Sequence, residues 1–103
     1  MYYILDELTV APGDLAGIRA RVEREYVPGA VARGLTLERT LVSTVELHDE
    51  PNQLLFLWSF PDVAAYWASR SAANRDPAVS AFWRDLDRDL VARTRRVFNE
   101  ETS

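Results

Sequence analysis

The chain has 103 residues, of which 48% are hydrophobic and 27% charged, and its formal net charge is −4 at pH 7. These values are typical of one folded domain with a hydrophobic core, and the chain is too short for two domains of ordinary size. Because no basic block is longer than Arg95-Arg96, we expect no nucleic-acid partner.

Several functions are excluded by missing residues. The chain has no cysteine, which excludes disulfides, thiolate nucleophiles and cysteine-ligated metals. No secretory signal is visible, since Asp6 and Glu7 interrupt the first apolar segment, and no run reaches the ~20 apolar residues of a membrane span. We therefore expect a cytoplasmic protein without a membrane partner. All twelve basic residues are arginines, and we expect a bacterial source.

The first third predicts a strand followed by a helix. Residues 2–10 alternate and include aromatic and β-branched members, which predicts a strand, and the turn 11–14 ends in a helix N-cap residue, Asp14. Apolar residues then recur at helical spacing, with an expected break at Pro28-Gly29 and a last turn ending at Arg33-Gly34. The stripe consists of Leu15, Ile18, Val22, Tyr26 and Ala30.

The middle predicts a hairpin. Residues 35–48 carry apolar or β-branched residues at both odd and even positions, which indicates a long, bent strand with a bulge near Arg39 or Ser43. Residues 48–52 form a polar turn, and residues 53–60 are the most apolar segment of the chain.

The last third predicts two helices and a strand. Pro61 and Asp62 suit the start of a short helix, and Asp76-Pro77 supplies the N-cap and first position of a second one. Residues 91–98 predict a strand, and the exposed-looking Arg93, Arg95 and Arg96 indicate an edge position. A frayed tail is expected at 99–103. The second helix carries an apolar stripe made of Val79, Phe82, Trp83, Leu86 and Leu90.

This order predicts a ferredoxin-like α+β fold, βαββαβ, with a four-stranded antiparallel sheet and the second helical region split in two. Alternation along residues 53–60 places Leu54, Phe56, Trp58 and Phe60 on one face and Leu55 and Leu57 on the other. The helices can cover only one face, and each exposed side chain would forgo about 1.5–3 kcal/mol of burial. We therefore expect a homodimer through the second face, which closes an α/β barrel.

The stretch LWSFPDVAAYWASRSAANRDPAVSAFW, residues 57–83, resembles the dimeric α/β-barrel superfamily, and within it NIPSNAP-like domains most of all. The resemblance extends more distantly to antibiotic-biosynthesis-type monooxygenases, polyketide cyclases and muconolactone-isomerase-like proteins. It implies a pocket between the sheet and the helices. The superfamily also includes haem-degrading monooxygenases, which place an axial histidine after the helix. This chain has Asn74 and Arg75 there, so we expect no haem. We expect no other cofactor either.

We expect the pocket to be bordered by Asp6, Tyr66, Trp67, Arg70 and Asn74. Arg70 lies on the apolar side of its helix, so it either pairs with a carboxylate such as Asp6 or receives an anionic ligand. Asp6 and Glu7 point to opposite faces, and only one of them can face inward. If that one is Asp6, it is either a general base or the partner of Arg70 or Arg39.

The other candidates have plainer explanations. Trp67 can line the pocket mouth, whereas Trp58 and Trp83 are expected in the core. Asn74 can orient a substrate carbonyl or form an ordinary Asx turn. His48, the only histidine, lies at a polar turn without the spacing of a metal site, so no metal is expected.

Two functions follow from these residues. The first is a homodimer that binds a small aromatic or apolar ligand, as a binding protein, a cofactor-independent monooxygenase or a cyclase or isomerase. The alternative is a non-catalytic structural or interaction domain whose pocket is filled by Trp67 and Trp83. Whether the protein is an enzyme stays open at this point.

Overall fold

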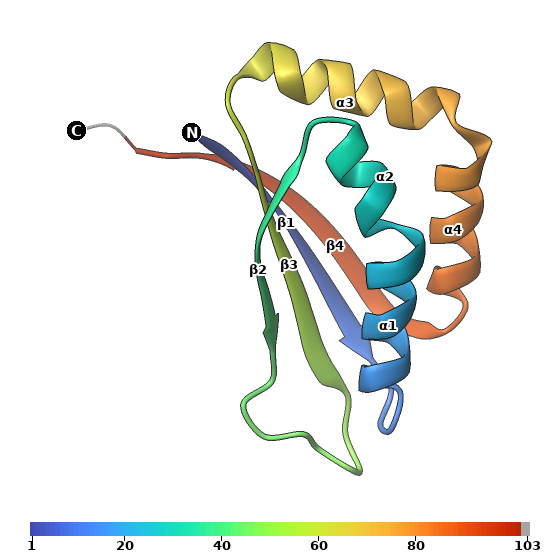
Figure 1. Ribbon diagram of the computed structural model, residues 1–103. Helices are drawn as coiled ribbons and strands as arrows, with labels where there is room; N and C mark the ends of the chain where they lie inside the picture. The colour runs from blue at the N-terminus through green and yellow to red at the C-terminus, as the bar shows by residue number, and fades with distance from the viewer. Residues whose placement is uncertain (102–103) are drawn as a thin grey trace.

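The computed structural model describes residues 1–101 and has two layers, a twisted four-stranded sheet and four helices packed on one of its faces (Figure 1). The strands are β1 (Tyr2–Val10), β2 (Thr36–Val42), β3 (Asn52–Phe60) and β4 (Leu90–Asn99). They lie in the order β2-β3-β1-β4 and every pairing is antiparallel. This is the predicted ferredoxin-like α+β fold.

The central strands β1 and β3 hold the core. Their registers place Asp6 opposite Phe56 on one side and opposite Arg95 on the other. As predicted, Leu54, Phe56 and Trp58 point to the helix side and are fully buried. Burial alternates along β1, so Asp6 lies on this helix-facing side of the sheet and Glu7 lies on the opposite face.

The first helical region divides into α1 (Leu15–Glu25) and α2 (Val27–Ala32). The break falls at Tyr26, so Pro28 lies in the first turn of α2, where its missing N–H is tolerated. Gly34 follows the second helix with φ +103°, the left-handed conformation expected of a glycine at this position.

The predicted long strand 35–48 is wrong in its length, because β2 ends at Val42. Residues 43–51 form a loop, and the side chain of Asn52 holds it by bonding both the N–H and the C=O of Leu47 (2.8 and 3.0 Å). The bulge is confirmed, since the register with β3 shifts between Leu37 and Arg39.

The second helical region consists of α3 (Val63–Arg75) and α4 (Pro77–Asp87). Asp62 and Asp76 cap them by accepting hydrogen bonds from the N–H groups of Ala65 (2.7 Å) and Ala78 (2.9 Å). The first of these helices was predicted to be short, but it has 13 residues and runs through Asn74. It crosses above the ends of the strands, and α4 then descends beside α1 (Figure 1).

All four helices lie on one side of the sheet, so the other face is open (Figure 1). On that face the side chains of Leu5, Leu55 and Leu57 are only half-buried. At the two edges Leu41 and Phe98 are exposed. Among residues 1–101, no helix has the length and apolar character needed to cross a membrane.

Candidate functional site

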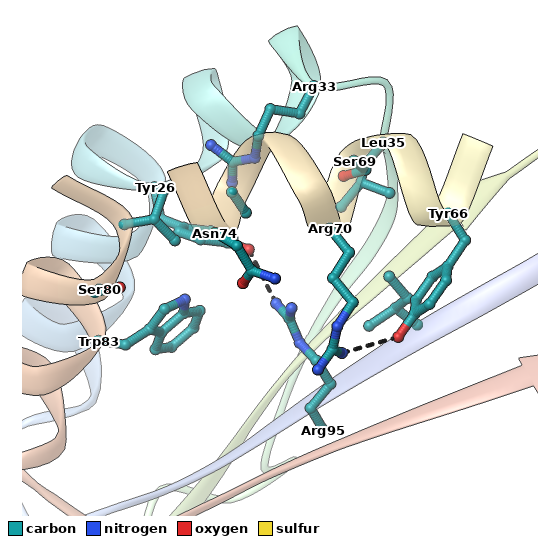
Figure 2. A pocket seen from close by; sticks show the side chains of 13 residues that line it. Tyr26, Arg33, Leu35, Tyr66, Ser69, Arg70, Asn74, Ser80, Trp83 and Arg95 are labelled. Atoms are coloured by element: carbon teal, nitrogen blue, oxygen red, sulfur yellow. Dashed lines mark hydrogen bonds between the residues drawn. The ribbon is translucent and has the colours of Figure 1, made fainter. Parts of the chain in front are cut away.

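A cavity of about 300 Å³ lies between the sheet and the helical layer, under α3 and beside the start of α4 (Figure 2). Its volume is at the lower end of the range of small-molecule sites, ~300–1,000 Å³. The lining combines aromatic walls with polar groups from several elements. It is formed by Ile4, Tyr26, Arg33, Leu35, Tyr66, Ser69, Arg70, Ala73, Asn74, Val79, Ser80, Trp83 and Arg95.

The floor of the cavity rests on a buried ion pair. Asp6 is 1% exposed, and its two oxygens accept hydrogen bonds from Nε and Nη2 of Arg95 at 2.6 and 2.9 Å. Trp58 donates its indole N–H to the same carboxylate at 3.1 Å. This pairing follows from the sheet register, which sets Asp6 and Arg95 directly opposite on neighbouring strands.

Arg95 is held in one orientation by these contacts. Its Nη2 also donates to the hydroxyl of Tyr26 at 2.9 Å. Burial lowers the pKa of Arg95, but the hydrogen bonds and charge of Asp6, with a smaller contribution from Tyr26, outweigh that effect and raise it overall. The guanidinium therefore stays charged, and its Nη1 group makes no hydrogen bond within the described residues.

Arg70 enters the cavity from α3, on the side opposite Arg95 (Figure 2). Its Nη1 donates to the hydroxyl of Tyr66 at 3.1 Å, one helical turn earlier. No carboxylate of residues 1–101 forms an ion pair with Arg70. The predicted alternative in which Arg70 pairs with Asp6 is therefore wrong, because Arg95 occupies both carboxylate oxygens.

Arg33 borders the cavity from the end of the α1–α2 region. Its guanidinium lies over the ring of Tyr26, with 5.6 Å between the guanidinium carbon and the ring centroid. In the part of the chain that the structure describes, its Nε is a buried donor without an acceptor. A buried donor in this state costs about 1–3 kcal/mol, so an acceptor supplied from outside would stabilise it.

The aromatic walls come from the core. Tyr26 lies edge-on to Trp83, with ring centroids 4.8 Å apart, and Tyr66 lies 5.4 Å from Phe60. These contacts fix the rings without filling the cavity. Trp83 was predicted as a core residue, and it both packs against the core and faces the cavity.

The residues proposed from the sequence separate into three groups. Tyr66, Arg70 and Asn74 line the cavity. Asp6 lies beneath it and reaches it only through Arg95, which argues against a general-base role because its oxygens are already engaged. Trp67 is 59% exposed and lies outside the lining, since neighbouring helix residues project about 100° apart.

Sequence reasoning missed Arg33, Arg95 and Tyr26 as lining residues. Arg95 was interpreted as an exposed edge residue, although its alternation with Arg96 places one of the two on the helix side. A signal for Arg95 was present in the neighbouring strand. There the adjacent acids Asp6 and Glu7 point to opposite faces, as Arg95 and Arg96 do. The structure confirms that pattern, because Arg96 bonds Glu7 at 3.0 Å on the open face.

No metal-binding group of three or more histidine or acidic side chains occurs among residues 1–101. His48 lies in the loop between β2 and β3, away from the cavity lining.

Comparison with known proteins bears on the fold. No protein-family model and no curated protein matches the chain. Among solved structures, an uncharacterized NIPSNAP domain protein from Burkholderia xenovorans superposes with a TM-score of 0.77 at 14% identity, over 98% of this chain and 95% of its own. The chain has the fold of NIPSNAP domain proteins, as the sequence resemblance predicted.

Two further structures extend the comparison. A putative antibiotic biosynthesis monooxygenase from Nitrosomonas europaea has a TM-score of 0.68 at 10% identity, with 97% and 98% of the two chains covered. A dimeric ferredoxin-like protein from an uncultured marine organism has a TM-score of 0.68 at 8% identity, with 99% and 89% covered. At these identities the likeness concerns the fold alone.

Proposed function

We propose that the protein is a homodimer that binds a small aromatic molecule in the cavity between sheet and helices. The observation that carries the proposal is a cavity of about 300 Å³ with aromatic walls and polar groups, among them Arg95, which Asp6 and Tyr26 hold in one orientation. Small-molecule sites are concave and combine apolar walls with polar groups that fix the orientation of the ligand, and here the polar groups make up about half of the lining residues. The residues proposed to contact the ligand are Tyr26, Tyr66, Arg70, Asn74 and Trp83.

The dimer is supported by the open face of the sheet. Leu5, Leu55 and Leu57 form a central apolar row there, and Leu41 and Phe98 extend it to both edges. Packing a second copy on this face would bury these side chains at about 25 cal/mol per Å² of apolar surface. The structurally similar marine protein is described as dimeric and ferredoxin-like.

The opposing possibility was a domain whose cavity is filled by its own tryptophans. Trp67 points outward, and Trp83 leaves the cavity open beside it. These positions favour ligand binding over a purely structural role.

A second candidate function is catalysis without a cofactor. Arginine and tyrosine donors in the cavity are suited to stabilise an enolate or phenolate, the anion that precedes isomerisation, cyclisation or cofactor-independent oxygenation. In this second function the substrate supplies the reactive carbon, and Arg70 with Arg95 would stabilise the developing oxygen charge. Two structurally similar proteins are described as antibiotic biosynthesis monooxygenases, one of them as putative.

Calorimetric titration with 2-naphthamide, a neutral bicyclic aromatic, tests the binding proposal. We expect binding to the native protein, a loss of roughly tenfold in Trp83→Ala, and no change in Trp67→Ala, the matched exposed control. Equal weakening in both variants, or binding that neither variant changes, would place the ligand elsewhere.

Oxygen uptake in the presence of 1,2,4-trihydroxynaphthalene, corrected for the spontaneous oxidation of that compound, tests the catalytic candidate. We expect Arg70→Met to lower the rate.

A further inference from the structure

We infer that the ligand is an aromatic carboxylate, whose carboxylate is bound by Arg70 and by the free edge of Arg95 while its ring lies among Tyr26, Tyr66 and Trp83. This inference rests on the proposed ligand-binding function and specifies its substrate class. The argument depends on the hydrogen-bonding character of the lining, its charge and the contrast with the other arginines.

The charged groups of the lining, all arginines, offer only hydrogen-bond donors, although Ser69, Asn74 and Ser80 can also accept. Arginine has five N–H donors and no acceptor, and only one donor of Arg70 is used, by the Tyr66 hydroxyl. The hydroxyls of Tyr26 and Tyr66 accept from Arg95 and Arg70, so their own hydrogens remain free to donate. A ligand that satisfies the arginines and tyrosines of this lining therefore presents acceptors.

The cavity also has excess positive charge. Three guanidinium groups line it, while among residues 1–101 the one carboxylate that pairs with any of them is that of Asp6 beneath Arg95. Two positive charges are therefore uncompensated, in a chain whose net charge is −4. In a cleft with low-dielectric walls this concentration of charge attracts anions more strongly than the same groups would in open solvent.

Most of the other arginines are neutralised by carboxylates. Within residues 1–101, eight of the twelve arginines form ion pairs with carboxylates, and four form none, namely Arg33, Arg39, Arg70 and Arg75. Two of these four, Arg33 and Arg70, line the cavity. Two other hollows, one between α1 and α4 and one at the start of α1 beside Asp89, contain Arg21, and there it is neutralised by Asp89 at 2.6 Å and Glu25 at 4.0 Å. Within the described residues, the cavity under α3 thus differs from these two hollows in containing arginines that form no ion pair.

The geometry of the two groups suits a carboxylate. Arg70 and Arg95 reach into the same cavity from the helix layer and from the sheet (Figure 2). Asp6 holds Arg95 on its Nε and Nη2 atoms, which leaves Nη1 unbonded. A planar carboxylate can accept from the fork of one guanidinium and from a single N–H group of the other, and such charge-assisted bonds are about twice as strong as neutral ones.

The test compares 2-naphthoate with 2-naphthamide, which has nearly the same shape without the charge, by isothermal titration of the native protein at low salt. We expect the carboxylate to bind roughly 10- to 100-fold more tightly. Arg70→Met should remove most of this preference, while Arg70→Lys, which keeps the charge but not the fork, should retain part of it. Arg75→Met is the matched control, because Arg75 lies on the same helix outside the cavity lining, and its preference should equal that of the native protein.

The outcomes separate the two proposals. Equal affinity for naphthoate and naphthamide, or a preference that Arg70→Met leaves intact, overturns the carboxylate assignment and leaves the aromatic-binding function standing. Binding of neither compound overturns both. Because Arg70 is exposed and outside the core, its substitution should leave the unfolding midpoint near that of the native protein, which circular dichroism checks in the same samples.

Discussion

The two faces of the sheet differ in the side chains that they bury and expose. On the helix side polar groups lie deep in the protein, and Asp6 is balanced by Arg95 and Trp58 within the same chain. On the open side apolar groups lie near solvent, and Leu55 and Leu57 have no covering layer in the single chain. This difference is the basis for proposing a ligand site on the first face and a second copy of the chain on the second. Four variants test this comparison, from the largest expected effect to the smallest.

Asp6→Asn should be the most destabilising. The change leaves the shape nearly intact but removes the charge that neutralises Arg95. Breaking a buried ion pair costs about 3–5 kcal/mol, and we expect a value near the lower end because 34% of the Arg95 side chain is exposed. Denaturant unfolding measures this loss of folding free energy.

A matched surface pair is Arg93 with Asp87 at 2.7 Å, and Asp87→Asn should cost less than ~1 kcal/mol. Equal losses in the two variants would remove the distinction between the buried and the surface pair.

Leu57→Glu should act through assembly. It places a charge at the centre of the open face, so the proposed dimer should dissociate at micromolar concentration, with a loss of about 1.5–3 kcal/mol per buried leucine. Sedimentation velocity reports the mass. Val31→Glu is the control, because Val31 is apolar and 51% exposed on the helix side. A native protein that sediments as a monomer would contradict the interpretation of this face.

Tyr26→Phe removes one hydroxyl and retains the ring. That hydroxyl accepts a hydrogen bond from Arg95 at 2.9 Å, so we expect a loss of about 0.5–1.5 kcal/mol in thermal unfolding. Tyr3→Phe, on the half-buried open face, is the comparison and should be nearly neutral. An effect as large as that of Asp6→Asn would mean that Tyr26, rather than Asp6, fixes Arg95.

The sequence was sufficient to predict the fold because its signals were local. The alternation in residues 53–60 and the caps Asp62 and Asp76 each determine structure within a few residues. The strand 35–48 was overextended because its apolar residues at both parities fit a strand, and the hydrogen bonds of Asn52 that make a loop there come from outside the segment.

The site was only half predictable for a related reason. Tyr66, Arg70 and Asn74 share one helix, and their common location follows from helical spacing. Arg95 joins Asp6 only through the pairing of β1 with β4, and the exact register of strands 89 residues apart does not follow from composition or periodicity.

The smallest expected effect is the pH dependence of the surface pair. Hydrogen bonding and charge from Arg93 lower the pKa of Asp87, although slight burial opposes them. A lowered pKa stabilises the folded state above the unfolded-state pKa of about 3.9, and this stabilisation is lost as the pH falls through the folded-state pKa. Stability measured from pH 5 to pH 2 should therefore fall slightly less steeply in Asp87→Asn, by under ~1 kcal/mol, since the Asp87 side chain is 44% exposed. A steeper fall in Asp87→Asn than in the native protein would contradict the lowered pKa of Asp87.

The most direct test of the division between the faces is amide chemical-shift mapping of the native protein during titration with 2-naphthoate. We predict changes at Ser69, Ala73 and Ser80 around the cavity, and none at Leu55 or Leu57 on the open face. Shifts confined to the open face would contradict the placement of the site between the sheet and the helices.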